Sequence, residues 1–157
     1  SITYTPCIAF MVALKYGYST TIEAHGMGVI QNRSVMWITD NQQKGISPDV
    51  LTLTVHTTDA FAWEHWETRE EELVPLLLEE LRPYFLPEAV VAYSLHRWRY
   101  SRVARPYPGL FFAPAHSNLP LILAGDAFSA TAPSVTRVED AAISAWAAAA
   151  YIGDLSR

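Results

Sequence analysis

The chain of 157 residues is half hydrophobic, has a formal net charge of −5 and contains one cysteine. Its length and apolar content suit a folded chain with a sizeable core, and they exclude disordered, collagen-like and disulfide-stapled classes. The acidic balance argues against DNA or an anionic membrane as the main partner, and the lone Cys7 excludes an internal disulfide and a thiolate-rich zinc site.

The first residues carry neither a basic region nor an apolar signal core, and no apolar run approaches the ~20 residues that span a bilayer. We therefore expect a cytoplasmic protein without a membrane anchor, and a single thiol suits that reducing compartment. Ser1 in place of an initiator Met favours a chain that begins inside a longer protein.

Strands are expected first along the chain. Residues 2–14 form a long apolar stretch with β-branched side chains, and residues 35–39 form a second strand. Leu51, Leu53 and Val55 alternate with polar residues, and this period of two is typical of a strand with one buried face. Together these segments predict a sheet.

A helix of roughly three turns is expected next, ending near Arg82. Thr68 and Glu71 have the spacing of a capping box, in which the two side chains satisfy the first backbone N–H groups. The leucines that follow recur at helical intervals, at positions 73, 76, 77 and 81. Pro75 predicts a kink or a late start of this helix.

A further strand is expected over residues 88–100, before a proline-rich connection to residues 110–113. Aromatic rings and guanidinium groups alternate in it and so occupy opposite faces, the rings being His96, Trp98 and Tyr100 and the guanidinium groups Arg97 and Arg99. The basic strip lies in a stretch without Asp or Glu and suits a small anionic ligand. Arginines lying along a sheet edge explain it equally well.

The last forty residues predict a corner between a strand and a helix. Residues 121–124 form an unbroken apolar run, typical of a strand buried on both faces, and Gly125 and Asp126 follow it. A second capping-box pattern over residues 136–139 opens an alanine-rich helix over residues 141–152. Ligands with negative charge bind at such corners, because the free N–H groups and the dipole of the helix attract them.

Other catalytic patterns are absent from the sequence. The five histidines form no H-E-x-x-H motif, so no metal site is predicted. No G-x-S-x-G elbow or Walker loop occurs, and Cys7 lies in an apolar strand that favours a core position. The seven glycines form no G-x-G-x-x-G phosphate-binding fingerprint.

Several segments resemble the renalase-like and flavin-containing amine oxidase family of FAD-dependent oxidoreductases, in the family's order, from about Tyr4 to Ile152. They are WITDNQQKGIS, LTLTVHTTDAF, HRWRYSR, LILAGDAF and RVEDAAISAWAAAAYI. The resemblance is to the C-terminal portion of that family. It implies an α+β fold with a mainly antiparallel substrate-domain sheet over residues 1–115. Residues 116–157 would be the closing strand and helix of a Rossmann-like FAD-binding domain, whose N-terminal half with the G-x-G-x-x-G fingerprint lies elsewhere.

The resemblance also implies a function and a set of site residues. The whole enzyme would oxidise a reduced nicotinamide-type or amine substrate with oxygen as acceptor, and this fragment alone would be incomplete. The flavin would carry the chemistry, so no protein side chain is expected to be catalytic. The expected FAD contacts are Gly125, Asp126, Arg137, Val138 and Glu139. The expected substrate pocket comprises Trp37, His96, Arg97, Trp98, Arg99 and Tyr100.

A second hypothesis is a catalytically silent ligand-binding or interaction domain that retains the fold. Asp140 stands where the family's helix usually has Gly, and Ala145 stands where a second Gly is common. Both add bulk near the expected flavin. Turnover by the flavin would separate the two hypotheses, because a binding module gives none.

Overall fold

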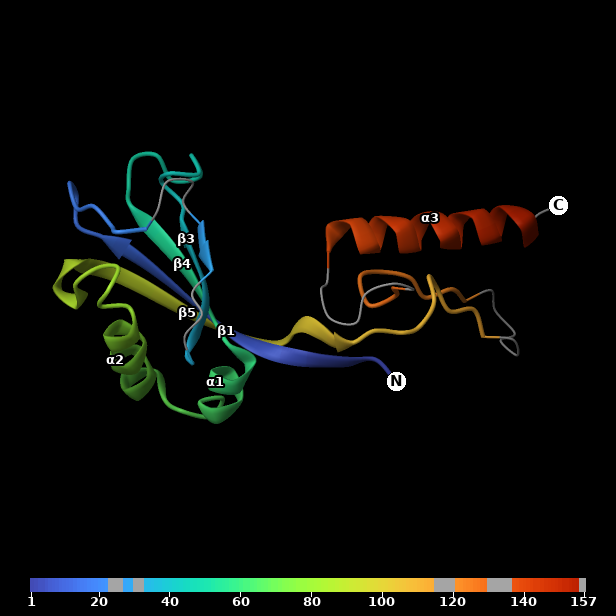
Figure 1. Ribbon diagram of the computed structural model, residues 1–157, viewed down its shortest axis with the longest axis horizontal. Coiled ribbons are helices and arrows are strands. Elements are labelled where there is room, and N and C mark those ends of the chain that lie inside the picture. Colours follow the sequence, from blue (N-terminus) through green and yellow to red (C-terminus); the bar gives the residue numbers. More distant parts are fainter. Residues whose placement is uncertain (23–26, 30–32, 115–120, 130–136, 156–157) are drawn as a thin grey trace. The chain divides into compact units, whose positions relative to one another are not determined.

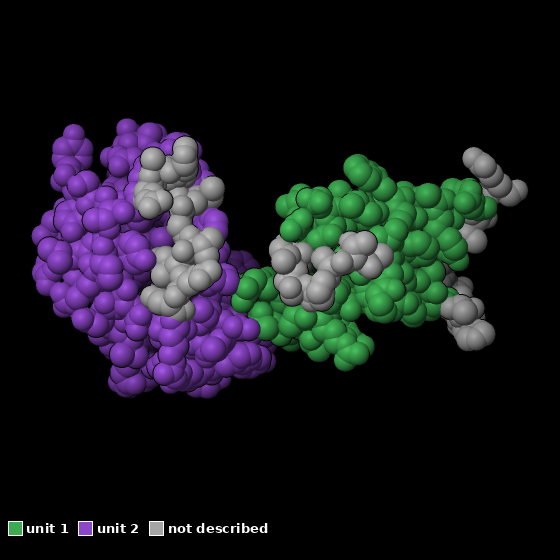
Figure 2. Space-filling view, viewed as in Figure 1, with its two compact units in different colours: residues 1–5, 100–157 green, residues 6–99 purple. Residues whose placement is uncertain are grey.

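The computed structural model describes residues 1–22, 27–29, 33–114, 121–129 and 137–155. Figure 2 colours its two compact units, one formed by residues 1–5 and 100–157 and the other by residues 6–99. We call them unit 1 and unit 2. The predicted boundary between residues 115 and 116 lies outside the described residues.

Unit 2 is built on a five-stranded sheet of order β2-β3-β4-β1-β5 (Figure 1). The strands are β1 (Thr3–Leu14), β2 (Met27–Val29), β3 (Val35–Asp40), β4 (Thr52–Thr57) and β5 (Val90–Arg105). Strands β2, β3, β4 and β1 pair antiparallel with one another in this order, and β5 lies at the edge beside β1. The strands expected over 2–14, 35–39, 51–55 and 88–100 are therefore confirmed, and the chain is an α+β protein.

Helices α1 (Asp59–Glu64) and α2 (Glu70–Glu80) belong to the same unit, and a short 3-10 turn over Pro87–Ala89 precedes β5. Thr58 starts α1, because its hydroxyl accepts a hydrogen bond from the N–H of Phe61 at 3.2 Å. The sequence pattern does not predict this helix. Its six residues are too few to show a hydrophobic period.

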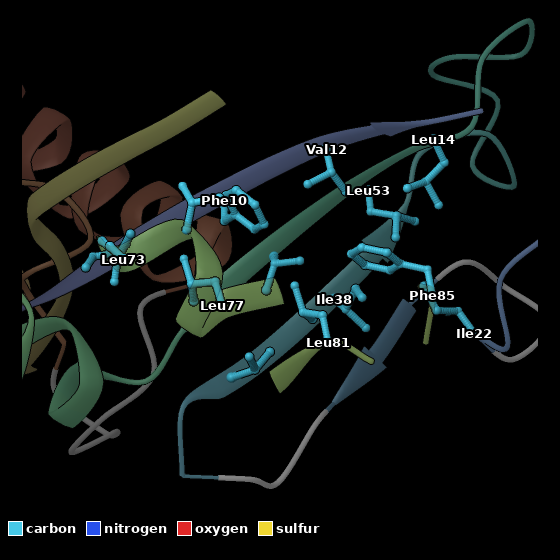
Figure 3. Packing of buried hydrophobic residues seen from close by; sticks show 14 of the residues in the cluster. Phe10, Val12, Leu14, Ile22, Ile38, Leu53, Leu73, Leu77, Leu81 and Phe85 are labelled. Carbon is cyan, nitrogen blue, oxygen red and sulfur yellow. The ribbon is translucent and has the colours of Figure 1, made fainter. Parts of the chain in front are cut away.

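The helices pack on one face of the sheet through a single apolar core (Figure 3). Fully buried leucines at 73, 77 and 81 meet strand residues that include Phe10, Ile38 and Leu53. The alternation of β4 is visible here, since Leu53 and Val55 are buried while Thr52, Thr54 and His56 are only partly covered. Burial of such side chains contributes roughly 1.5–3 kcal/mol each and fixes which face of the sheet the helices cover.

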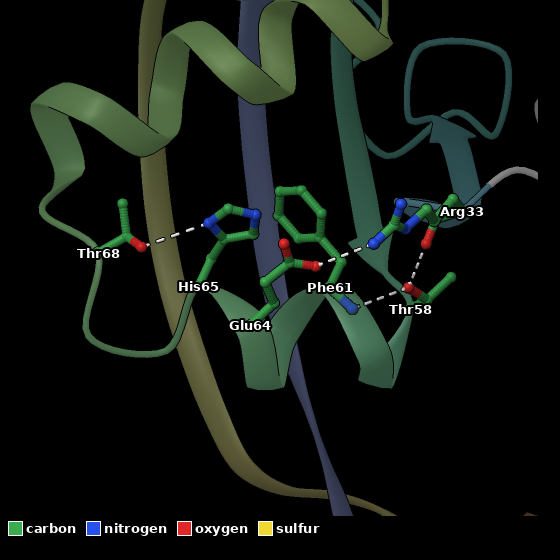
Figure 4. Close-up of polar contacts among 6 residues, drawn as sticks. All are labelled: Arg33, Thr58, Phe61, Glu64, His65 and Thr68. Atoms are coloured by element: carbon green, nitrogen blue, oxygen red, sulfur yellow. Dashed lines mark hydrogen bonds and ion pairs between the residues drawn. The ribbon is translucent and has the colours of Figure 1, made fainter.

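The capping box expected at α2 is wrong. The residue before the helix is Arg69, which makes no side-chain cap, and the Thr68 hydroxyl instead lies 3.3 Å from Nδ1 of His65 (Figure 4). Of the two effects predicted for Pro75, a kink or a late start, the late start is wrong, because α2 begins at Glu70 and continues past Pro75. Three glutamates in the first turn offset the missing cap by their interaction with the helix dipole.

In unit 1, residues 121–124 do not form a strand buried on both faces. They join the rest of the described unit by one antiparallel bridge, from Leu123 to Phe112, and Leu121 and Leu123 are 49% and 46% exposed. A strand becomes buried only when neighbours pair with it and helices cover it, and this segment has neither among the described residues. The Rossmann-like assignment of residues 116–157 therefore stays a prediction.

Helix α3 (Val138–Leu155) confirms the expected alanine-rich helix and extends it at both ends. Thr136 of the expected capping box lies outside the described residues. The start of α3 is held by Asp140, whose carboxylate accepts a hydrogen bond from the N–H of Arg137 at 3.2 Å.

Candidate functional site

Two surfaces carry most of the predicted site residues, and the first is the sheet face of unit 2 opposite the helices. Residues paired across neighbouring strands project to the same side, so the register defines this face. One row contains Trp37, His56 and Ala9, and the next contains Thr39, Thr54 and Met11. No helix of the described part of unit 2 covers these rows. We call them, with Asn41 and the facing residues of β5, the open sheet face.

Hydroxyl and amide groups on the open sheet face are held in place by one another. The indole Nε1–H of Trp37 donates to Oγ1 of Thr39 at 2.7 Å, which sets the orientation of the indole ring. Asn41 Nδ2–H donates to Oγ1 of Thr54 at 3.1 Å and to Oγ1 of Thr52 at 3.3 Å. A flat aromatic surface therefore lies next to preoriented polar groups, as in many ligand-binding sites.

Strand β5 extends this face. Ala92 and Ser94 line an open depression of about 390 Å³ together with Met11, Ala13 and Thr54. By the alternation of the strand, His96 and Trp98 continue along the same side. Their rings are 4.3 Å apart between centroids, so the two predicted pocket residues contact each other.

Trp37 shares the open sheet face with His96 and Trp98 but lies on a distant strand. Strands β4 and β1 separate β3 from β5, which places them about 14 Å apart at the usual strand spacing. The structure therefore brings His96 and Trp98 together and leaves Trp37 as a second aromatic surface on the same face.

Arg97 and Arg99 lie on the other side of β5, where they contact the linker between α1 and α2. Nη2–H of Arg97 donates to the carbonyl oxygen of Thr68 at 2.6 Å. The guanidinium carbon of Arg99 lies 5.6 Å from the ring centroid of Trp66, within the range of a cation–π contact. From the sequence, these two arginines could either bind an anion or lie along a sheet edge. In the structure both side chains hold a neighbouring segment.

Tyr100, the remaining predicted pocket residue, belongs to unit 1. Its ring meets that of Tyr4 edge-on at 5.7 Å and is 72% exposed.

The second surface is the glycine-aspartate corner of unit 1. Gly125 has φ +143°, a backbone conformation that favours glycine, and its N–H donates to Oγ of Ser144 on α3 at 2.8 Å. Ser144 is fully buried, so this bond ties the turn to the middle of the helix. Asp126 is exposed beside it.

The first turn of α3 carries the other predicted cofactor residues, Arg137, Val138 and Glu139, all of them exposed. The N–H of Arg137 donates a hydrogen bond to the Asp140 carboxylate and is therefore not free for a ligand. Glu139 and Asp140 place two acidic groups in this turn. The N–H groups and the dipole attract negative charge here, whereas the two carboxylates oppose it.

Ser144 was not predicted as a residue of the corner. The sequence gives one indication of its role: Ser144 carries a hydroxyl group within ISAWAAAA, an otherwise apolar segment of the helix. Thr39 was also missed as the partner of Trp37. A two-residue spacing on one strand was the signal there.

Two negative findings concern only the described part of the chain. There, no three His, Cys, Asp or Glu side chains are grouped as metal ligands would be. No helix in the same ranges is long and apolar enough to cross a membrane.

A half-covered antiparallel sheet and a separate glycine-aspartate corner joined to a helix define an α+β chain. The family model described as flavin containing amine oxidoreductase matches residues 25–153, and the chain belongs to this family. A flavin cofactor is implied by that membership. A comparison with curated proteins gives no match.

The described part of the corner leaves room for one edge of a flavin. Apart from the chain neighbours of Gly125, no heavy atom of the described residues lies within 4 Å of the place where its Cβ would stand, so a flat group has space to approach the backbone. The Ser144 bond keeps the turn and the helix in a fixed relation. The phosphate-binding fingerprint that would hold the other end of a dinucleotide does not occur in this sequence.

Proposed function

We propose that the chain is the C-terminal portion of a renalase-like, FAD-dependent oxidoreductase that oxidises a reduced nicotinamide-type or amine substrate, with oxygen as acceptor. One observation carries the proposal: the family match over residues 25–153 includes the β3, β4 and β5 residues of the open sheet face and the glycine-aspartate corner. Neither surface alone would support it as well, because a sheet face and a corner each occur in many unrelated proteins.

The corner would bind the flavin. The N–H groups of Val138 and Glu139 would donate to its pyrimidine edge, and the dipole of α3 would stabilise negative charge there. Asp126 would accept hydrogen bonds from the ribityl chain, beside the open backbone of Gly125, and Arg137 remains a predicted cofactor contact at the start of α3. When bound, the flavin would supply hydride acceptance from the substrate.

The open sheet face would bind the substrate. The Trp37, His96 and Trp98 rings would stack on a planar group, and the hydroxyl and amide groups of Thr39, Thr54 and Asn41 would orient it by hydrogen bonds. Arg97 and Arg99 would act as positioning residues that hold β5 from its other side. Tyr100 remains a predicted pocket residue in unit 1.

A further part of the polypeptide, the FAD-binding half with the phosphate fingerprint, would complete the enzyme. Exposed apolar side chains in unit 1 support this part of the proposal, because isolated folded units seldom leave so many uncovered. They include Leu121, Leu123, Val138, Ile143 and Trp146, of which Val138 is 89% exposed.

A titration with FAD, followed by flavin fluorescence, tests the corner. We expect saturable binding, either by the chain alone or after a family FAD-binding half is supplied separately. Replacing the Asp140 carboxylate by Asp140→Asn should strengthen this binding about two- to fivefold, because it removes a negative charge from the helix start. Asp154→Asn, at the other end of α3, is the matched control and should leave binding unchanged.

Anaerobic addition of substrate then separates the enzyme from a silent binding domain. Bleaching of the bound flavin by a reduced nicotinamide or an amine would support the proposal. If FAD fails to bind in both arrangements, or binds without being bleached, the silent ligand-binding or interaction domain is the better reading. The bond from Arg137 to Asp140 is the observation that favours that reading, since it removes one donor from the helix start.

A further inference from the structure

The glycine-aspartate corner of unit 1 is held from two directions. On one side, the N–H of Tyr107 donates to the carbonyl oxygen of Ala127 at 2.8 Å, and the rings of Tyr107 and Phe128 lie 5.4 Å apart between centroids. On the other side, the N–H of Gly125 donates to Oγ of Ser144 on α3 at 2.8 Å. The first set of contacts holds the end of the turn, and the bond to Ser144 holds its beginning.

The beginning of the turn depends on Ser144 because Gly125 makes few other contacts. Its φ of +143° is open to glycine, and no heavy atom of the described residues, chain neighbours apart, lies within 4 Å of its Cβ position. The carbonyl oxygen of Gly125 accepts the N–H of Phe128 at 3.1 Å, which closes the turn but does not orient the peptide that precedes it. Among the described residues, Ser144 is therefore the group that orients the peptide entering Gly125.

Ser144 is an unfavourable choice for the helix alone. The other members of residues 141–150 are alanine, isoleucine and tryptophan, and alanine has the higher helix propensity. The Ser144 side chain is also fully buried, and a buried hydroxyl without a partner would be destabilising. Its bond to the corner offsets this cost, which indicates a role outside helix formation.

The same bond decides how the corner can meet a ligand. Both peptide groups of Gly125 are engaged within the protein, the N–H by Ser144 and the carbonyl oxygen by Phe128. Gly125 therefore contributes open space and a particular backbone angle. The exposed Asp126 follows directly in the chain, so the angle of Gly125 sets the direction in which the Asp126 side chain points.

We infer that Ser144 is a positioning residue for the flavin site. Through the N–H of Gly125 it holds the turn at one angle, and Asp126 is thereby presented to the ribityl chain that it is proposed to bind. Because Ser144 is fully buried, it acts through Gly125 and not by direct contact with the cofactor. This role rests on the proposed function, since it takes the corner to be the flavin site.

Two variants of α3, studied by NMR without flavin, separate this role from general support of the helix. Ser144→Ala removes the hydroxyl and suits a helix, so the amide proton signal of Gly125 should move upfield while α3 amides exchange no faster than in the wild-type chain. Ala148→Gly is the matched control, because Ala148 is buried one turn further along α3. It should speed the exchange of α3 amides about fivefold and leave the Gly125 signal in place.

FAD titrations of the same chains, with the family FAD-binding half supplied where the wild-type chain requires it, test the effect on the cofactor. Ser144→Ala should weaken FAD binding about three- to tenfold, as expected for the loss of one neutral hydrogen bond. It should also change the visible circular dichroism of the bound flavin, which reports the groups around the ring. Ala148→Gly should leave both the affinity and the spectrum unchanged.

Failure of the proposed function and failure of this role give different results. A wild-type chain that binds no FAD in either arrangement overturns the proposed function, and the role of Ser144 toward flavin with it. If the wild-type chain binds FAD and Ser144→Ala binds it equally well with the same spectrum, only the role of Ser144 is overturned. Equal weakening by Ala148→Gly, or an unmoved Gly125 signal in Ser144→Ala, would overturn that role as well.

Discussion

At the scale of single residues, β5 shows how one strand serves two purposes. His96 and Trp98 project to the open sheet face, while Arg97 and Arg99 hold the α1–α2 linker from the other side. Arg97 also has its Nε buried without a hydrogen-bond partner among the described atoms. Its guanidinium therefore depends on the Thr68 carbonyl to offset the loss of water.

Replacing Arg97 should reveal this structural role. We expect Arg97→Gln to lower the free energy of unfolding by about 1–2 kcal/mol, because it removes a charge-assisted hydrogen bond in a partly buried position. Urea unfolding followed by tryptophan fluorescence measures the change. Arg105→Gln, an exposed arginine of the same strand, should change stability by less than about 0.5 kcal/mol. Equal losses of unfolding free energy in the two variants would show that the hydrogen bond between Arg97 and Thr68 does not stabilise the fold.

At the scale of elements, the leucines of α2 show which side of this helix packs on the sheet and which side faces solvent. Leu73 and Leu77 are fully buried against the sheet, whereas Leu76, one residue away from Leu77, is 44% exposed at a pocket between the helices. The same helix therefore packs the core with one side and meets solvent with the other.

Neighbouring leucines of α2 provide a matched pair of truncations. Leu77→Ala should cost about 2–4 kcal/mol of stability, because it leaves a cavity in the core. Leu76→Ala should cost less than about 1 kcal/mol, since that side chain already meets solvent. Thermal and urea unfolding of both variants would measure this difference, and a loss at Leu76 as large as at Leu77 would contradict the assigned face of the helix.

At the scale of the whole molecule, the two units have very different cores. Unit 2 encloses one large apolar cluster from strands and helices, while the buried cluster of unit 1 contains only Val103, Ala127 and Phe128 among the described residues. In α3, Ser144 and Ala148 are buried, and Trp146 is 72% exposed. Because packing supplies most of the stability of a helix in a protein, unit 1 should be the less stable unit.

Native-state hydrogen exchange tests this difference between the units. Amides of α3 should exchange at least about ten times faster than those of β4, because local opening of unit 1 exposes little buried surface. The β4 amides serve as the internal reference in the same sample. Protection of α3 equal to that of β4 would mean that unit 1 is stabilised as strongly as unit 2.

The sequence by itself determined the elements that have a clear period and a single packed face. The strand at residues 52–57 shows the period of two, and the helices at 70–80 and 138–155 follow from leucine spacing and from alanine content. Sequence order also predicted the flavin family, because short motifs with weak individual value follow one another over most of the chain. Local patterns suffice here because each residue's environment repeats along its own element.

Only the tertiary structure decided which groups meet. By its spacing, Thr68 could cap a helix with its hydroxyl. In the structure this hydroxyl instead pairs with His65, and the backbone carbonyl of Thr68 accepts a hydrogen bond from Arg97. The run at 121–124 was apolar enough for a buried strand, yet its burial depends on neighbours that sequence does not provide. Contacts of this kind are chosen by competition among distant groups in three dimensions, so spacing along the chain cannot decide them.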